Sequence, residues 1–174
     1  MSIEYIVKKN KNELSQRKKE GLLKLAKLIQ VFRLDPVFAV EWLFGIQLLD
    51  FQAYVFLKSW VTPNCVWCQC RGSGKTTLGS PFIMLKNLLI PNYQAYILAS
   101  SGSQSKNMFS KIEQIAKREI ESFTGLNDVF FNETVKNVAN KDGFTHNPNS
   151  YEFKLYNGSC TNTLNSVPDN MRGK

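Results

Sequence analysis

The sequence predicts an α/β fold with a parallel sheet, and three observations support this prediction. Apolar residues recur at steps of three and four in several stretches, which is helical spacing. Two short apolar runs, residues 65–70 and 94–100, have the length of buried strands. A segment with helical periodicity follows each run, and the order strand, helix, strand, helix is typical of a parallel sheet with right-handed crossovers.

Three helices are expected before the first strand. Between residues 12 and 32 the apolar side chains follow helical spacing. Asp35 and Pro36 should end this helix and begin a short second one, because Asp is a preferred N-cap and Pro suits the first helical turn. A third helix is expected over residues 51–60.

The next part of the chain predicts a strand and a helix in alternation. Residues 65–70 are expected to form a buried strand that uses its cysteines as small hydrophobic residues. An apolar helix should follow after residue 75, with Pro81 near its start. The strand at 94–100 then leads into a long helix at 104–123.

The C-terminal part has a different pattern. Residues 140–150 predict a polar loop rich in Asn. Residues 151–156 alternate in polarity and residues 159–164 return, so the two segments predict a hairpin. The intervening Asn157-Gly158 pair is the strongest short signal for a hairpin turn.

The spacing of the cysteines is also compatible with a zinc site or a redox site. Cys65 and Cys68 have C-x-x-C spacing, but a closed zinc site needs four ligands, usually as two close pairs. The remaining candidates include Cys160 and the sole histidine, His146. The sequence therefore favours buried structural cysteines over a metal site.

Composition and charge point to a globular chain with polyanionic partners. The 174 residues are 43% hydrophobic and contain no apolar run of 18 residues, so we expect a soluble, unsecreted protein. The net charge of +8 favours partners with phosphate groups. The segment 8–33 is the most basic, and a solvated helix face explains it as well as a nucleic-acid patch does.

One motif carries chemistry. Residues 72–76, Gly-Ser-Gly-Lys-Thr, follow an apolar run and precede a helix, as a phosphate-binding P-loop does. Backbone N–H groups of a glycine-rich turn at a helix N-terminus form a concave site for phosphate oxygens. Lys75 can then reach the β- and γ-phosphates, and the Thr76 hydroxyl can ligate Mg²⁺.

With these residues the chain resembles the N-terminal ATPase region of the large terminase subunit of tailed phages, the motor that packages DNA. That family often replaces the first P-loop glycine, here Gln69, and places an arginine inside the loop, here Arg71. Three further stretches are similar to the family. They are residues 49–52, residues 97–105, and residues 153–159 with 169–173.

The resemblance implies a P-loop NTPase with a three-layer, helicase-like core and an incomplete parallel sheet. It implies ATP and Mg²⁺ as cofactors, with Gln52 at the adenine and Thr76 on the metal. Lys75 and Arg71 would act in catalysis, Arg71 in the manner of an arginine finger. The nucleotide contacts that it implies fall on Gln52, Arg71, Gly72, Ser73, Gly74, Lys75, Thr76 and Thr77.

The resemblance also sets expectations for domains and partners. It divides the chain into a basic helical segment, 1–47, and a partial ATPase domain, 48–174, without the Walker B strand, the coupling motif or the nuclease domain. Double-stranded DNA, the portal and the small terminase subunit would be partners of a complete, ring-forming protein. The expected location is the host cytoplasm, where virions assemble, and no membrane is involved.

The sequence contains no apolar strand that ends in Asp-Glu, the pair that helps to hold Mg²⁺ and to position the attacking water. We therefore expect this chain to bind ATP and to hydrolyse it poorly. Two alternatives remain: a fragment of a helicase-like DNA translocase, and a non-catalytic basic module that binds nucleic acid or a portal and has a vestigial P-loop.

Overall fold

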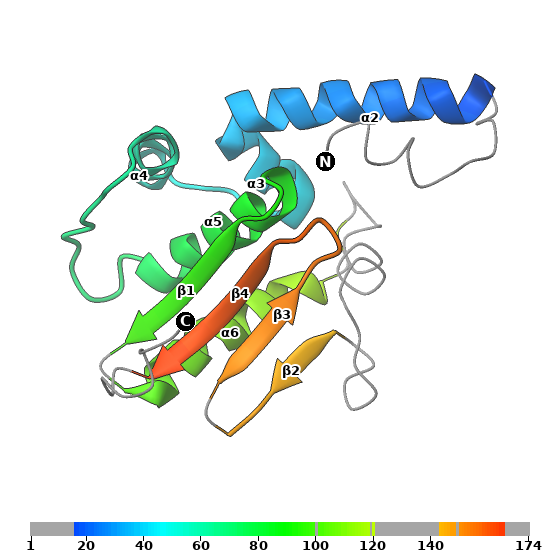
Figure 1. Ribbon diagram of the computed structural model, residues 1–174. Coiled ribbons are helices and arrows are strands. Elements are labelled where there is room, and N and C mark those ends of the chain that lie inside the picture. The colour runs from blue at the N-terminus through cyan, green and yellow to red at the C-terminus, as the bar shows by residue number, and fades with distance from the viewer. Residues whose placement is uncertain (1–15, 100, 119, 121–142, 149, 166–174) are drawn as a thin grey trace.

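A computed structural model describes residues 16–99, 101–118, 120, 143–148 and 150–165 of the chain. Within these residues the fold is α/β, as the sequence predicts, and no described helix is long and apolar enough to cross a bilayer. The helices are α2 (Gln16–Leu34), α3 (Pro36–Phe44), α4 (Asp50–Val61), α5 (Lys75–Leu89) and α6 (Gly102–Ala116). The strands are β1 (Gln94–Ala99), β2 (Phe144–His146), β3 (Tyr151–Lys154) and β4 (Cys160–Asn165) (Figure 1).

The strands form one mixed sheet in the order β1-β4-β3-β2. Strands β1 and β4 run parallel, with Gln94 opposite Cys160, whereas β3 pairs antiparallel with both β4 and β2. The expected parallel sheet is thus correct only for β1 and β4. The rest is antiparallel because β3 and β4 are joined by a tight hairpin, which reverses the chain direction.

The hairpin turn is confirmed at Asn157 and Gly158. Gly158 has a φ of +86°, and a Cβ on it would lie 2.0 Å from Oδ1 of Asn92. Only glycine fits both the backbone conformation and this close approach. The amide of Asn157 also donates to the carbonyl of Asn87 on α5, at 2.7 Å, so the turn is held against the helix.

The predicted helices before residue 62 are confirmed, with α2 running on to Leu34 and residues 1–15 lying outside the described part. Asp35 caps α3 as predicted, because its Oδ1 accepts the Phe38 N–H at 3.0 Å. The long helix expected at 104–123 is corrected: α6 begins at Gly102 and ends at Ala116. The polar loop expected at 140–150 contains the short strand β2.

The expected buried strand at residues 65–70 is wrong. This segment has no strand partner among the described residues, and Val66 is 88% exposed. Trp67 anchors the segment to two helices, because its indole N–H donates to Oγ of Ser59 at 2.7 Å and its ring meets the ring of Phe82 edge-on. An apolar run becomes a strand only where a neighbouring strand satisfies its backbone groups, and no described strand does so for this one.

Helices α5 and α6 pack against β1 and β4, and Figure 1 shows both helices behind the sheet. Ala95 and Ile97 of β1 are buried, whereas the alternate residues Tyr96 and Leu98 are 41% and 52% exposed. Among the described elements, one face of the sheet is therefore covered by helices. The three-layer arrangement that the resemblance implies remains a proposal.

The C-terminal ends of three helices are joined in a closed cycle of side-chain caps. Arg33 of α2 donates through Nε, at 3.0 Å, and through its terminal amino group to the Leu89 carbonyl of α5. Lys86 of α5 donates to the Trp60 carbonyl of α4 at 3.2 Å, and the Trp60 indole donates to the Arg33 carbonyl at 3.1 Å. Each bond satisfies a carbonyl that a helix end leaves unpaired.

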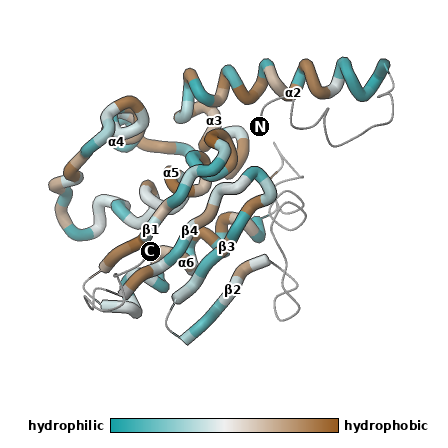
Figure 2. The backbone as a smooth tube through the Cα atoms, viewed as in Figure 1, coloured by the Kyte–Doolittle hydropathy of each residue, from teal (hydrophilic) through white to brown (hydrophobic). Residues whose placement is uncertain are grey.

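This cycle fixes the end of α2 to α5. Figure 2 shows that hydrophobic and hydrophilic residues alternate along α2. The first part of α2 is largely exposed, and Phe32 near its end is buried in the core shared with α3 and α5. The basic helix is therefore attached through its last two turns, where Leu28 and Ile29 also pack against the core.

We predict that Arg33→Met lowers the free energy of unfolding by about 1.5 kcal/mol, the lower end of the range for a hydrogen bond from a charged group. Methionine keeps the apolar stem and removes only the donors. Arg17→Met is the matched control, because Arg17 lies on the same helix and is exposed. Denaturant unfolding of both variants measures the difference, and equal stabilities would contradict the capping role.

Candidate functional site

Residues 69–74 form an irregular loop, and Lys75 and Thr76 begin the first turn of α5. Gly72 and Gly74 have φ angles of +90° and +86°, a region that residues with a Cβ rarely adopt. Helical hydrogen bonding begins at Gly74, whose carbonyl accepts the Leu78 N–H at 2.8 Å. The two glycines that the motif supplies therefore stand where the backbone requires glycine.

The first turn of α5 presents backbone donors. Its N-cap, Gly74, has no side-chain cap, and no acidic residue lies in the first turn. Within the described part of the chain, the N–H groups of Gly74, Lys75 and Thr76 have no hydrogen-bond partner. Free N–H groups and the positive end of the helix dipole favour an anion at this position.

The Lys75 ammonium lies over the loop. Its Nζ donates to the carbonyls of Gln69, at 2.6 Å, and Cys70, at 2.8 Å. The Ser73 hydroxyl lies 2.8 Å from the same Cys70 carbonyl and 3.1 Å from Oε1 of Gln69. No carboxylate of the described residues forms an ion pair with Lys75, so its charge is available to an anion.

Gln52 reaches the loop from α4, as its proposed role requires. Its Oε1 accepts the Leu49 N–H at 3.1 Å, and its Nε2 lies 3.4 Å from the Ser73 carbonyl oxygen. A Cβ built on Gly74 would lie 3.1 Å from the same Nε2. The structure thus brings together two positions 21 residues apart in the chain, while the contact with an adenine remains a prediction.

The other predicted residues lie at the same end of α5. Arg71, Thr76 and Thr77 are exposed, and the Arg71 guanidinium makes no hydrogen bond or ion pair with the described residues. Of the further stretches that carry the resemblance, residues 97–99 end β1 and residues 101–105 form the N-cap and first turn of α6, while residue 100 lies outside the described part. Residues 153–159 form β3 with the hairpin turn, and residues 169–173 lie outside the described part.

Sequence reasoning missed the residue that anchors the approach to the loop. Trp67 is held by Ser59 at the end of α4 and by Phe82 of α5, so it fixes the chain just before Gln69. The sequence shows only that Trp67 is the one large aromatic residue in the run 65–70. A partner on another element cannot be read from that run.

The cysteines are free thiols and do not act as buried hydrophobic residues, which corrects the expectation. Cys65, Cys68 and Cys70 are exposed, and Cys160 on β4 is half-buried. Burial raises the pKa of the Cys160 thiol, Glu152 raises it further, and Lys154 and Asn162 lower it by less than burial raises it. Among the described residues, no three of His, Cys, Asp and Glu gather as metal ligands do.

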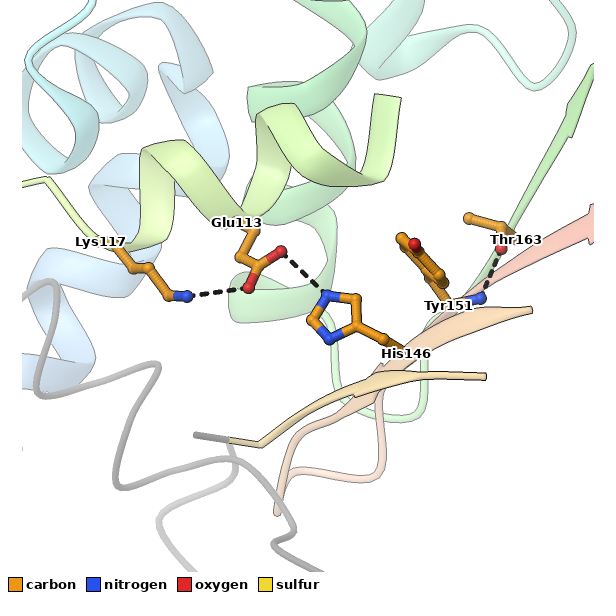
Figure 3. Close-up of polar contacts among 5 residues, drawn as sticks. All are labelled: Glu113, Lys117, His146, Tyr151 and Thr163. Atoms are coloured by element: carbon orange, nitrogen blue, oxygen red, sulfur yellow. Dashed lines mark hydrogen bonds and ion pairs between the residues drawn. The ribbon is translucent and has the colours of Figure 1, made fainter. Parts of the chain in front are cut away.

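A second polar cluster lies between α6 and the sheet. Glu113 stands between Lys117, at 2.8 Å, and the His146 Nε2, at 3.1 Å (Figure 3). The Tyr151 ring meets the His146 ring edge-on at 4.6 Å, and the Tyr151 N–H donates to Oγ1 of Thr163 at 2.7 Å. These contacts tie α6 to β2 and β3, so the cluster has a structural explanation.

Comparison with known proteins adds no assignment, since no family model matches the chain and no curated protein matches it. The candidate site is therefore defined by its own geometry. That geometry is a loop of backbone donors, one lysine above it and a glutamine from α4 beside it.

We predict that Cys65, Cys68 and Cys70 react rapidly with a disulfide reagent in the folded protein, whereas Cys160 reacts slowly. The thiolate is the reactive form, and the raised pKa of Cys160 leaves less of it at neutral pH. Raising the pH should therefore speed up the slow phase.

The absorbance of the thiol released by the reagent measures the rates of the fast and the slow cysteines. Cys160→Ser is the control, because it removes the slow phase. If Cys65 and Cys68 reacted only after unfolding, the buried strand expected from the sequence would be correct and the exposed segment wrong.

Proposed function

We propose that this chain binds ATP with Mg²⁺ through residues 69–76. The observation that carries the proposal is the combination at one helix end of two positive-φ glycines, unpaired N–H groups and a lysine without a carboxylate partner. Each of these features favours phosphate, and their order along the chain is that of a P-loop.

The residues fit the ligand in chemical terms. The N–H groups of Gly74, Lys75 and Thr76 supply neutral donors without any side chain in the first turn that would repel an anion. The Lys75 ammonium gives up its two carbonyl partners, Gln69 and Cys70, and exchanges them for phosphate oxygens. Charge-assisted hydrogen bonds to phosphate are the stronger ones, so this exchange is favourable.

The remaining residues would complete the site. The exposed Thr76 hydroxyl is the protein group that would hold Mg²⁺, which neutralises phosphate charge when bound. The exposed Arg71 guanidinium would contact the terminal phosphate and stabilise charge there. We propose Gln52 as the residue nearest the base, because it reaches the loop from α4.

At the level of the complete protein we propose a DNA-packaging terminase, in which ATP hydrolysis drives double-stranded DNA into a procapsid. The resemblance of the loop and its arginine supports this role. The exposed basic residues of α2 support a polyanionic partner, and they are Arg17, Lys18, Lys19, Lys24 and Lys27. A non-catalytic basic module is the second candidate, favoured by the same helix, and it predicts no measurable affinity for ATP.

We predict that Lys75→Ala weakens binding of Mg²⁺–ATP by about 1.5–3 kcal/mol, the range for a hydrogen bond from a charged group. Isothermal titration calorimetry measures the loss. Lys58→Ala is the matched control, because it removes the same charge from an exposed position on α4 and should leave affinity unchanged.

An unchanged affinity in Lys75→Ala, or an equal loss in both variants, would remove Lys75 as the phosphate-binding lysine. Wild-type protein without affinity for ATP would instead favour the non-catalytic module.

A further inference from the structure

We propose that Gln52 is a positioning residue for the loop at residues 69–74. By holding the Ser73 carbonyl it fixes the direction in which the Gly74 N–H points, in addition to any contact of Gln52 with the base. The inference rests on the proposed function and adds a role for a side chain that the resemblance assigns to the adenine. It starts from the two contacts of the Gln52 amide, one with Leu49 and one with Ser73.

The contact with Ser73 is the hydrogen bond that ties the loop to an element other than α5. The remaining side-chain bonds of the loop join Lys75 and Ser73 to Gln69 and Cys70, and all four residues belong to the loop or to the first turn of α5. Within the described part of the chain, no other side chain outside the loop bonds to residues 69–74. Gln52 is therefore the external support of this turn.

The geometry of the peptide bond transmits this contact to the binding side. In a trans peptide the C=O and the following N–H point in opposite directions. When Gln52 holds the Ser73 carbonyl, the N–H of Gly74 must point away from Gln52, where no described residue accepts it. That N–H is then presented to a ligand.

Without Gln52, little else fixes this peptide. Gly74 has no Cβ and can adopt both signs of φ at low cost, so the Ser73–Gly74 peptide is free to rotate. Glycine is also what admits Gln52, since a Cβ on Gly74 would lie 3.1 Å from Nε2. The same absence of a side chain thus makes the turn loose and lets Gln52 restrain it.

Gln52 is itself held in place. It is the third residue of α4, and its Oε1 accepts the N–H of Leu49, the residue at the N-cap. This half of a capping box fixes the side chain at the start of a helix. A donor fixed before the ligand arrives loses less conformational entropy on binding, which raises affinity.

A positioning role and a base contact make different predictions. If Gln52 orients the Gly74 N–H, its loss weakens every ligand that places phosphate in the loop, whatever the base. If Gln52 reads only the adenine, its loss weakens ATP and leaves GTP and tripolyphosphate unchanged. Tripolyphosphate, which has no base, separates the two directly.

The test compares Gln52→Met with wild type by calorimetry of ATP, GTP and tripolyphosphate. Methionine keeps the length of the side chain and removes its donor and acceptor without adding charge. We expect about a three- to tenfold loss of affinity for GTP and tripolyphosphate, as for one hydrogen bond, and a loss at least as large for ATP. Gln47→Met, which makes the same change at an exposed glutamine before α4, should leave all three affinities unchanged.

Gln52→Asn is the second variant, because it keeps the amide but is one methylene shorter and cannot span the distance to Ser73. It should also lose affinity for all three ligands, tripolyphosphate included. It replaces Gln52→Met in the test if that variant does not unfold cooperatively. A loss confined to ATP, no loss at all, or an equal loss in Gln47→Met would overturn the inference. Wild-type protein that binds none of the three ligands would instead defeat the proposed function.

Discussion

The burial of helix α5 is the constraint on which both the fold and the candidate site depend. This helix packs against every other described helix and against β1 and β4. Its apolar residues Leu78, Met84 and Leu85 are fully buried, and burial of side chains of this size contributes about 1.5–3 kcal/mol each. Because the body of α5 cannot shift without opening this core, its N-terminus is a fixed base for the loop. A binding turn built on a buried helix holds its donors more accurately than a turn between two exposed segments.

Polar contacts at the other end of α5 join it to the C-terminal hairpin. The side-chain amide of Asn87 donates to Oγ1 of Thr161 on β4 at 2.6 Å, and the backbone carbonyl of Asn87 accepts from the side-chain amide of Asn157 in the turn. The Ser159 hydroxyl donates to the Ile90 carbonyl at 2.8 Å. Buried hydrogen bonds of this kind fix one register of helix against sheet, since a slip would leave buried polar groups unpaired. The segments before and after residues 121–142 are therefore held together by directional contacts as well as by apolar packing.

What the sequence predicts correctly is set by short-range physics. The cap at Asp35 and the turn at Asn157 form bonds within a few residues, so their signals lie in the local sequence. The strand expected at 65–70 failed because pairing needs a partner from elsewhere, and an apolar run shows only that pairing would be tolerated. The loop at residues 69–74 depends on both local sequence and distant contacts. Spacing identified Lys75 and its glycines, and the family resemblance assigned Gln52 to the adenine. The contact of Gln52 with the loop could not be expected from the sequence, because it depends on how α4 packs beside α5.

The central claim is that the turn at the start of α5 receives phosphate through its own backbone. Two-dimensional amide NMR of the ¹⁵N-labelled chain, titrated with tripolyphosphate and then with Mg²⁺–ATP, tests this most directly. We expect saturable shifts of the Gly74, Lys75 and Thr76 amides, because their N–H groups gain acceptors. The amide of Gly158, a glycine with a similar φ in the hairpin turn, should not move. Loop amides that stay unchanged at saturating ligand, or shifts centred on the hairpin, would contradict the account.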